Sequence, residues 1–156
     1  PAVIEWPGFP RKGFHQLQRE LESSSASSEV QIFSSDRNEG AIRAARSNAQ
    51  RAGVEGDIRF SCRSISEPVD LGVENGLVVL NPPYGKRIGD LSRLHGLYKH
   101  FSKGLSHNYP GWRIAVVCPD KALAGRLAPG ISEVTRFRNG GIPVGLYLGE
   151  IPRSPK

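Results

Sequence analysis

Short apolar runs alternate with amphipathic segments along most of this 156-residue chain, and that alternation limits the fold more than any other feature of the sequence. Strands are expected at 30–33, 58–62, 76–80 and 113–118, the third of them fully buried. Strands joined by helices imply right-handed crossovers and a parallel sheet covered on both faces. Residues 133–151 instead predict two strands that fold back through Asn139-Gly140-Gly141. The expected fold is α/β, a single mostly parallel sheet that ends in an antiparallel hairpin.

The intervening segments carry helix signals of different strength. Apolar residues recur at helical spacing in 14–22, 34–57 and 91–105, and Asp120 is expected to cap a short helix at 121–128. In the second segment Asp36 and Glu39 are expected to form a capping pair, and Gly53 is a natural stop. We expect one partial domain over residues 1–151, a flexible serine linker at 23–28 and a mobile tail at 152–156.

Composition narrows the class of protein. The formal charge of +6 favours a polyanionic partner, although a solvated basic surface would give the same count. The two cysteines, Cys62 and Cys118, lie far apart and are expected to be buried reduced thiols, and no histidine stands at metal-ligand spacing, so no metal is predicted. No apolar run suits a membrane span or a secretory signal, which predicts a cytoplasmic location.

The tetrapeptide Asn81-Pro82-Pro83-Tyr84 follows the carboxyl end of the apolar strand 76–80. Parallel sheets bind their ligands at the carboxyl ends of the strands. The two prolines have no amide hydrogen, so this turn presents carbonyl oxygens, and the Asn81 side chain adds another. Tyr84 supplies a flat ring on which a nucleobase can stack. The alternative is a rigid turn that merely ends the strand. We predict a catalytic site that grips the exocyclic amino group of a base.

Such a nitrogen is a poor nucleophile, because its lone pair is delocalised into the ring. Two acceptors can align the lone pair and stabilise the positive charge that grows as nitrogen attacks an electrophilic carbon, for which a sulfonium methyl group is suitable. The cations that follow, Lys86 and Arg87, are predicted to contact phosphates beside an extruded nucleotide. Ordinary solvated residues would look the same in the sequence.

These residues resemble a known group of proteins. Over about 6–151, and above all in LNPPYG (80–85), in 32–60 and in LYLGEI (146–151), the sequence is similar to bacterial Rossmann-like RNA methyltransferases. Full-length members carry an N-terminal THUMP domain and methylate guanine N2 in large-subunit ribosomal RNA. The resemblance implies a Rossmann-like S-adenosylmethionine-dependent methyltransferase fold, with S-adenosylmethionine as cofactor and ribosomal RNA as partner.

By this resemblance Asp36, at the carboxyl end of the first strand predicted in this sequence, would bind the ribose hydroxyls of the cofactor. This role can coexist with a helix cap. Asn81 belongs to the same implied cofactor site. Arg37 stands where the family usually has an apolar residue against adenine, and Ser64 where it often has an acid for the adenine amino group. Both departures imply weaker or altered cofactor binding.

The family's glycine-rich cofactor loop, of the form Asp-Pro-x-Cys-Gly-Ser-Gly, has no counterpart in this sequence. The chain therefore resembles the C-terminal part of a catalytic domain without its first strand, and by itself is expected to have little or no activity. In the family that first strand lies between two others, which correspond here to the strand that leads to Asp36 and the strand that leads to Asn81. Without the first strand, each of its two neighbours has an unpaired edge. These two edges are therefore expected to pair directly, to associate in a dimer, or to leave the chain marginally stable.

Three functions follow as hypotheses from the sequence. The first is methylation of an exocyclic base nitrogen, guanine N2 in ribosomal RNA, by the parent protein. The second is an adenine-N6 DNA methyltransferase, which uses the same tetrapeptide. The third is a non-catalytic nucleic-acid-binding module with a degenerate methyltransferase fold, which the absent glycines, Arg37 and Ser64 favour.

Overall fold

A computed structural model describes residues 2–23, 30–84 and 91–153. The chain divides into two compact units, residues 1–32 and 33–156, and each is described by itself. The predicted phosphate contacts Lys86 and Arg87 lie outside the described residues, as do most of the predicted linker and the end of the predicted tail.

The first unit contains a short 3-10 helix, η1 (Ala2–Glu5), and the helix α1 (Arg11–Ser23). The helix predicted from the stripe in 14–22 is confirmed. Phe14 packs edge-on against Phe9, with ring centroids 5.4 Å apart.

A two-stranded sheet, of which Ile32 alone precedes the second unit, is made of β1 (Ile32–Asp36) and β2 (Ile58–Cys62). The two strands are joined by α2 (Glu39–Ala52) and the 3-10 turn η2 (Glu55–Asp57). The predicted strand at 30–33 lies two residues too early. The predicted stop of the helix is confirmed, because Gly53 adopts a left-handed φ of 73°. The predicted capping pair is wrong: the N-cap of α2 is Asn38, whose side chain accepts hydrogen bonds from the backbone N–H groups of Gly40 and Ala41.

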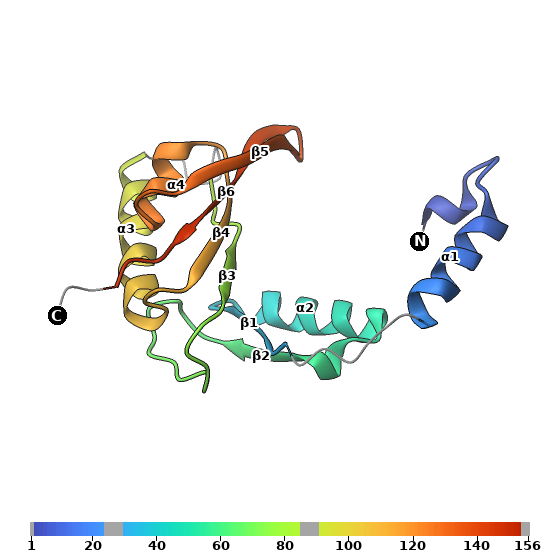
Figure 1. Cartoon of the computed structure of the whole chain (residues 1–156), viewed down its shortest axis with the longest axis horizontal. Helices are drawn as coiled ribbons and strands as arrows, with labels where there is room; N and C mark the ends of the chain where they lie inside the picture. The colour runs from blue at the N-terminus through green and yellow to red at the C-terminus, as the bar shows by residue number, and fades with distance from the viewer. Residues whose placement is uncertain (1, 24–29, 85–90, 154–156) are drawn as a thin grey trace. The chain divides into compact units, whose positions relative to one another are not determined.

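A four-stranded sheet follows, with the strand order β3-β4-β6-β5 (Figure 1). Its elements along the chain are β3 (Leu77–Leu80), α3 (Leu91–Asn108), β4 (Arg113–Cys118), α4 (Lys121–Leu127), β5 (Ser132–Asn139) and β6 (Ile142–Glu150). The β3–β4 pair is parallel, whereas β4–β6 and β5–β6 are antiparallel. The predicted α/β fold and its final hairpin are confirmed, and the described strands form two sheets instead of one.

Helices α3 and α4 cover one face of the four-stranded sheet and form the main core with it (Figure 1). Tyr98 and Leu105 of α3 and Ile114 and Val116 of β4 are fully buried there. As predicted, the Asp120 side chain caps α4, accepting hydrogen bonds from the backbone N–H groups of Ala122 and Leu123. Apolar burial on this face therefore positions the carboxyl ends of β3 and β4, where the predicted site lies.

Strand β3 departs from the expectation of a fully buried strand. Val78 and Leu80 pack against the core, but Leu77 is 51% exposed and Val79 is 69% exposed. The reason is that, among the described residues, β3 pairs only with β4, and no described element covers the face of Leu77 and Val79. Strands β1 and β3 belong to different sheets, so they do not pair directly as one alternative proposed. Dimerisation through these edges stays a prediction.

The hairpin of β5 and β6 extends beyond the rest of its sheet. Strand β4 pairs with residues 145–150 of β6, whereas β5 continues to pair with β6 as far as Asn139 and Ile142. Gly140 and Gly141 make the two-residue turn with φ values of 56° and 83°, which other residues rarely adopt. The tip therefore projects past the carboxyl end of β4 (Figure 1).

The loop between β2 and β3 crosses α3 at Gly104. A Cβ atom added there would lie 2.7 Å from the backbone oxygen of Ile65. One turn later Asn108 donates from Nδ2 to the same oxygen at 2.9 Å and to the backbone oxygen of Glu67 at 2.8 Å. A glycine and an asparagine of α3 thus fix the path of the loop.

Substituting Gly104→Ala should therefore lower the free energy of unfolding, because a backbone oxygen cannot move aside as a flexible side chain would. The matched control is Gly96→Ala on the same helix, where the added methyl group meets nothing within 4 Å. That change should stabilise the chain by about 0.5–1 kcal/mol, the helix propensity difference between glycine and alanine. Urea denaturation of both variants measures the difference, and equal stabilisation by the two would contradict the crossing.

Candidate functional site

Residues Asn81 to Tyr84 continue directly from β3, at the carboxyl end of the parallel β3–β4 pair. Asn81 is exposed, Pro82 is buried, Pro83 is exposed and Tyr84 is half-buried. Within the described residues the Asn81 side chain makes no hydrogen bond. The amide is therefore available to a ligand, while the buried Pro82 ring anchors the turn.

Tyr84 contacts a part of the chain that the sequence analysis did not connect with it. The Nδ2 atom of Asn139, the last residue of β5, donates a hydrogen bond to the Tyr84 hydroxyl oxygen at 3.0 Å. The tip of the hairpin therefore lies beside the turn. The only signal in the sequence was the Asn-Gly-Gly turn itself, which predicts a hairpin and not its neighbour.

The predicted ribose-binding residue, Asp36, is the last residue of β1 and is exposed. Its Oδ1 atom accepts a hydrogen bond of 2.7 Å from the backbone N–H of Asn38, and its backbone oxygen accepts one of 3.0 Å from Arg63. Because Asn38 caps α2, the carboxylate of Asp36 shapes the turn before the helix and is not its cap. Its exposure leaves it accessible to a diol.

The two residues that depart from the family pattern lie close to Asp36 along neighbouring chain segments. Arg37 is exposed, and its backbone oxygen accepts a 3.7 Å contact from the Cys62 sulfur. Ser64 is half-buried; its N–H donates to Glu67 at 2.9 Å and its hydroxyl lies 2.9 Å from that of Ser66. The structure therefore brings the ends of β1 and β2 together. Among the described residues, no hydrogen bond or ion pair links this group to Asn81 or Tyr84.

Several cations of the basic stretch 37–63 make contacts within the chain, and Arg43, Arg46 and Arg59 among them are exposed. Arg46 lies over the Phe60 ring at 5.4 Å, and Arg59 lies over Phe33 at 5.6 Å. Arg63 donates to the Tyr109 hydroxyl at 2.5 Å, and Arg43 pairs with Glu39 at 3.2 Å. These contacts add to local structure, and exposed pairs of this kind contribute little to stability.

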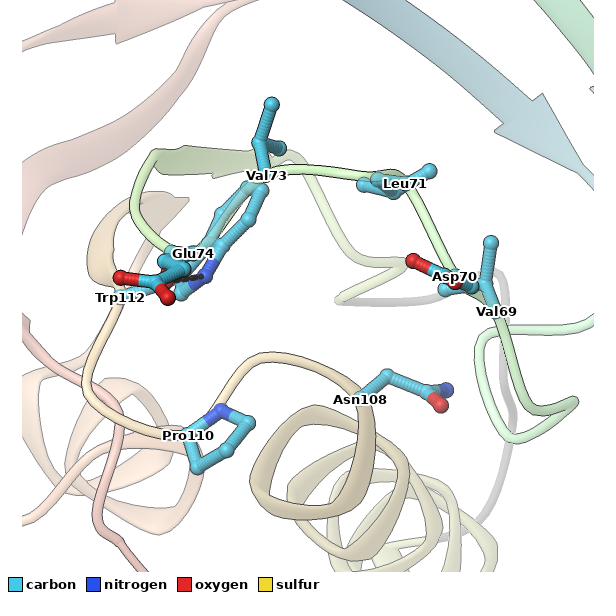
Figure 2. Close-up of a pocket in the computed structure, with 8 residues that line it drawn as sticks. All are labelled: Val69, Asp70, Leu71, Val73, Glu74, Asn108, Pro110 and Trp112. Carbon is cyan, nitrogen blue, oxygen red and sulfur yellow. Dashed lines mark hydrogen bonds between the residues drawn. The ribbon is translucent and has the colours of Figure 1, made fainter.

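A cavity of about 250 Å³ lies at the opposite end of the parallel pair (Figure 2). The loop 69–74 lines one side together with Trp112, whose indole N–H donates to the Glu74 backbone oxygen at 2.9 Å, and Asn108 and Pro110 lie opposite. These residues precede β3 and β4, whereas Asn81 follows β3. The cavity is therefore distinct from the predicted site.

The two cysteines differ in environment. Cys118, at the end of β4, is fully buried beside the Tyr98 hydroxyl at 3.6 Å, and burial raises the pKa of both groups. Cys118 is thus a neutral core thiol and not a nucleophile. Cys62 is exposed, so its predicted burial is wrong: it is the last residue of β2, and its sulfur donates to the backbone oxygen of Arg37 at 3.7 Å instead of packing in the core.

Two other kinds of site, a metal centre and a membrane span, are absent from the described residues. Among residues 2–23, 30–84 and 91–153, no group of three or more His, Cys, Asp or Glu has the geometry to hold a metal ion. Within the same described ranges no helix is both long and apolar enough to cross a bilayer.

The chemistry of the turn follows from its atoms. The Asn81 side chain has a carbonyl acceptor, and the backbone carbonyl of Pro82 is a second acceptor in the same turn. Two such acceptors suit the two hydrogens of an NH₂ group, and the half-buried Tyr84 ring offers a stacking surface. The arrangement can orient an amine and stabilise growing positive charge on nitrogen.

The sequence of this chain is similar to those of known methyltransferases. Residues 3–146 match the family model described as "RMKL-like, methyltransferase domain". A ribosomal RNA large subunit methyltransferase K/L from Syntrophotalea carbinolica is 34% identical over 69% of this chain. The match covers 15% of that protein, and the chain spans 15–38% of the first curated relatives it matches.

Solved structures share the fold. SMU.472, crystallised in complex with SAH, aligns with a TM-score of 0.70 and 20% identity over 97% of this chain and 40% of its own. TrmN from Thermus thermophilus aligns with a TM-score of 0.56 and 23% identity over 86% of this chain and 40% of its own. The fold is that of S-adenosylmethionine-dependent methyltransferases.

The separation of roles between Asp36 and Asn38 can be tested by stability. Asn38→Ala should lower the free energy of unfolding by about 1 kcal/mol, because two N–H groups of α2 lose their acceptor. Asp36→Ala should cost less, and Gln50→Ala, at an exposed position of the same helix, is the control. Thermal denaturation followed by circular dichroism provides the measurement. A larger loss for Asp36→Ala would restore Asp36 as the main cap.

Proposed function

The chain belongs to the RMKL-like methyltransferase domain family, and on this premise we propose that its natural protein transfers a methyl group from S-adenosylmethionine to an exocyclic amino group of RNA. The proposed acceptor is guanine N2 in large-subunit ribosomal RNA. The relative from Syntrophotalea carbinolica, a ribosomal RNA large subunit methyltransferase K/L by name, supports ribosomal RNA as the substrate class.

One observation supports the proposal above the others: Asn81 is exposed at the carboxyl end of β3 with no hydrogen bond to its amide in the described residues. A turn that merely ended a strand would have no need of an unbonded amide next to a buried proline. Asn81 and Pro82 orient the amino group, Pro83 stiffens the turn, and Tyr84 stacks on the base.

The methyl transfer requires no strong base in the turn. Bound S-adenosylmethionine would supply an electrophilic methyl group, and its transfer to nitrogen would break the S–C bond and release S-adenosylhomocysteine with the bonding electron pair. The amine becomes cationic, and acceptors at Asn81 and Pro82 stabilise that charge before a proton passes to water. The proposed roles of Lys86 and Arg87 at the RNA backbone lie outside the described residues.

The cofactor site is proposed on the ends of β1 and β2. Asp36 would bind the ribose diol through its exposed carboxylate, and Asn81 would lie near the reactive methyl group. Arg37 and Ser64 would face adenine in place of the family's apolar and acidic residues. The sequence contains no glycine-rich loop to hold the methionine part, so this chain alone is expected to be inactive.

Methyl transfer by the full-length natural protein tests the proposal directly. With labelled S-adenosylmethionine, label should enter large-subunit ribosomal RNA, and Asn81→Ala should reduce the rate by on the order of 100-fold, because the amine loses its alignment. Asn75→Ala, at an exposed asparagine before β3, is the control. Label found only in duplex DNA would favour adenine-N6 methylation instead.

Calorimetry with S-adenosylhomocysteine tests the cofactor argument. This chain alone should show no tight binding, because it lacks the glycine-rich loop. Tight binding by the chain would contradict that argument. Absence of binding by the full-length protein would support the non-catalytic nucleic-acid-binding module.

A further inference from the structure

The contact between Tyr84 and Asn139 joins the proposed catalytic turn to the end of a strand 55 residues later in the sequence. Strands β3 and β5 are the two outer strands of their sheet, separated by three interstrand spacings of about 4.8 Å each. Neighbouring strands therefore do not explain the contact. It exists because the hairpin tip projects past the carboxyl end of β4, on the side to which the turn runs.

The hairpin is built to hold its tip in place. At its base Arg136 donates two hydrogen bonds to the Glu133 carboxylate, at 2.8 and 2.7 Å, and the Tyr147 hydroxyl donates to the same carboxylate at 3.0 Å. Tyr147 is fully buried, and a Cβ atom added at Gly145 would lie 2.7 Å from the Tyr147 ring. The base of the hairpin is therefore anchored in the core.

The tip is held as well. The Arg138 guanidinium donates to the Gly141 backbone oxygen at 3.1 Å, across the two-glycine turn. Asn139 pairs with Ile142 in the ladder, so its backbone is the last ordered step of β5 before the turn. A side chain on such a rigid support can set the position of a partner at the ligand-facing edge.

We propose that Asn139 is a positioning residue for Tyr84, and this rests on the proposed function. The phenolic oxygen lies on the axis about which the ring flips, so a hydrogen bond to it restrains χ1, the direction in which the ring points, and leaves ring flips free. Asn139 thereby holds the ring in the orientation that stacks on the target base. Without it, the half-buried ring samples other rotamers and the base loses its platform.

A double-mutant cycle tests the mechanism in the full-length natural protein. Asn139→Ala should reduce kcat for RNA methylation by about 2- to 10-fold, the range that one exposed hydrogen bond sustains, with KM for S-adenosylmethionine unchanged. In a Tyr84→Phe background, which lacks the hydroxyl, Asn139→Ala should have no further effect. Equal reductions in both backgrounds would overturn the proposal.

The control is Thr135→Ala, an exposed residue of β5 that does not touch Tyr84. It should leave kcat within twofold of the natural protein, which separates loss of the contact from a general weakening of the hairpin. A kcat reduction by Thr135→Ala equal to that by Asn139→Ala would assign the effect to the hairpin and overturn the proposal.

A spectroscopic measurement on this chain keeps the test independent of activity. The NMR ring signals of Tyr84 should shift in Asn139→Ala and stay in place in Thr135→Ala. Tyr84→Phe leaves the hairpin sequence intact and should shift the side-chain amide signals of Asn139. If the full-length protein methylates no RNA but these shifts occur, the proposed function fails while the positioning contact stands. The contact itself would be refuted if the Tyr84 ring signals did not move in Asn139→Ala and the Asn139 amide signals did not move in Tyr84→Phe.

Discussion

The burial of β4 between β3 and β6 is the constraint on which the rest of the second unit depends. Its side chains Ile114, Val116 and Cys118 are fully buried against α3 and α4, so its direction and register are strongly specified. The parallel partner β3 then ends at the same edge as β4, and the antiparallel partner β6 begins its extension there. One buried strand thus brings the Asn-Pro-Pro-Tyr turn and the hairpin tip to the same edge of the sheet.

We place the proposed function at that edge, where one side of the turn is anchored in the core and the other is exposed. Pro82 is buried while Asn81 next to it is exposed, so two adjacent residues of the proposed site anchor the turn and face solvent, respectively. The Tyr98 and Cys118 side chains under the edge form a neutral, desolvated pair. A neutral support of this kind leaves the electrostatics of the site to the acceptors of the turn and to the substrate.

Charge in this molecule serves structure as much as binding. Arg46 and Arg59 lie over aromatic rings, and Arg43 pairs with an acid. The Glu133 carboxylate binds both Arg136 and Tyr147. The Arg136 guanidinium lowers the pKa of Glu133, so the cluster stays charged as pH falls toward the ordinary range of a carboxyl group. A basic composition therefore indicates the class of partner without identifying the residues that meet it.

Local signals in the sequence determined the elements of this protein. Gly53 and Asp120 end and begin helices because a left-handed φ and a side-chain acceptor act within one turn, and Gly140 with Gly141 specifies a hairpin for the same reason. At Asp36 the local pattern predicted the wrong cap, because Asn38 lies closer to the free N–H groups of α2 and its side chain accepts their hydrogen bonds. Only the tertiary structure decided the exposure of β3 and the contact of Asn139 with Tyr84, because strand order and burial depend on long-range packing that no local pattern encodes.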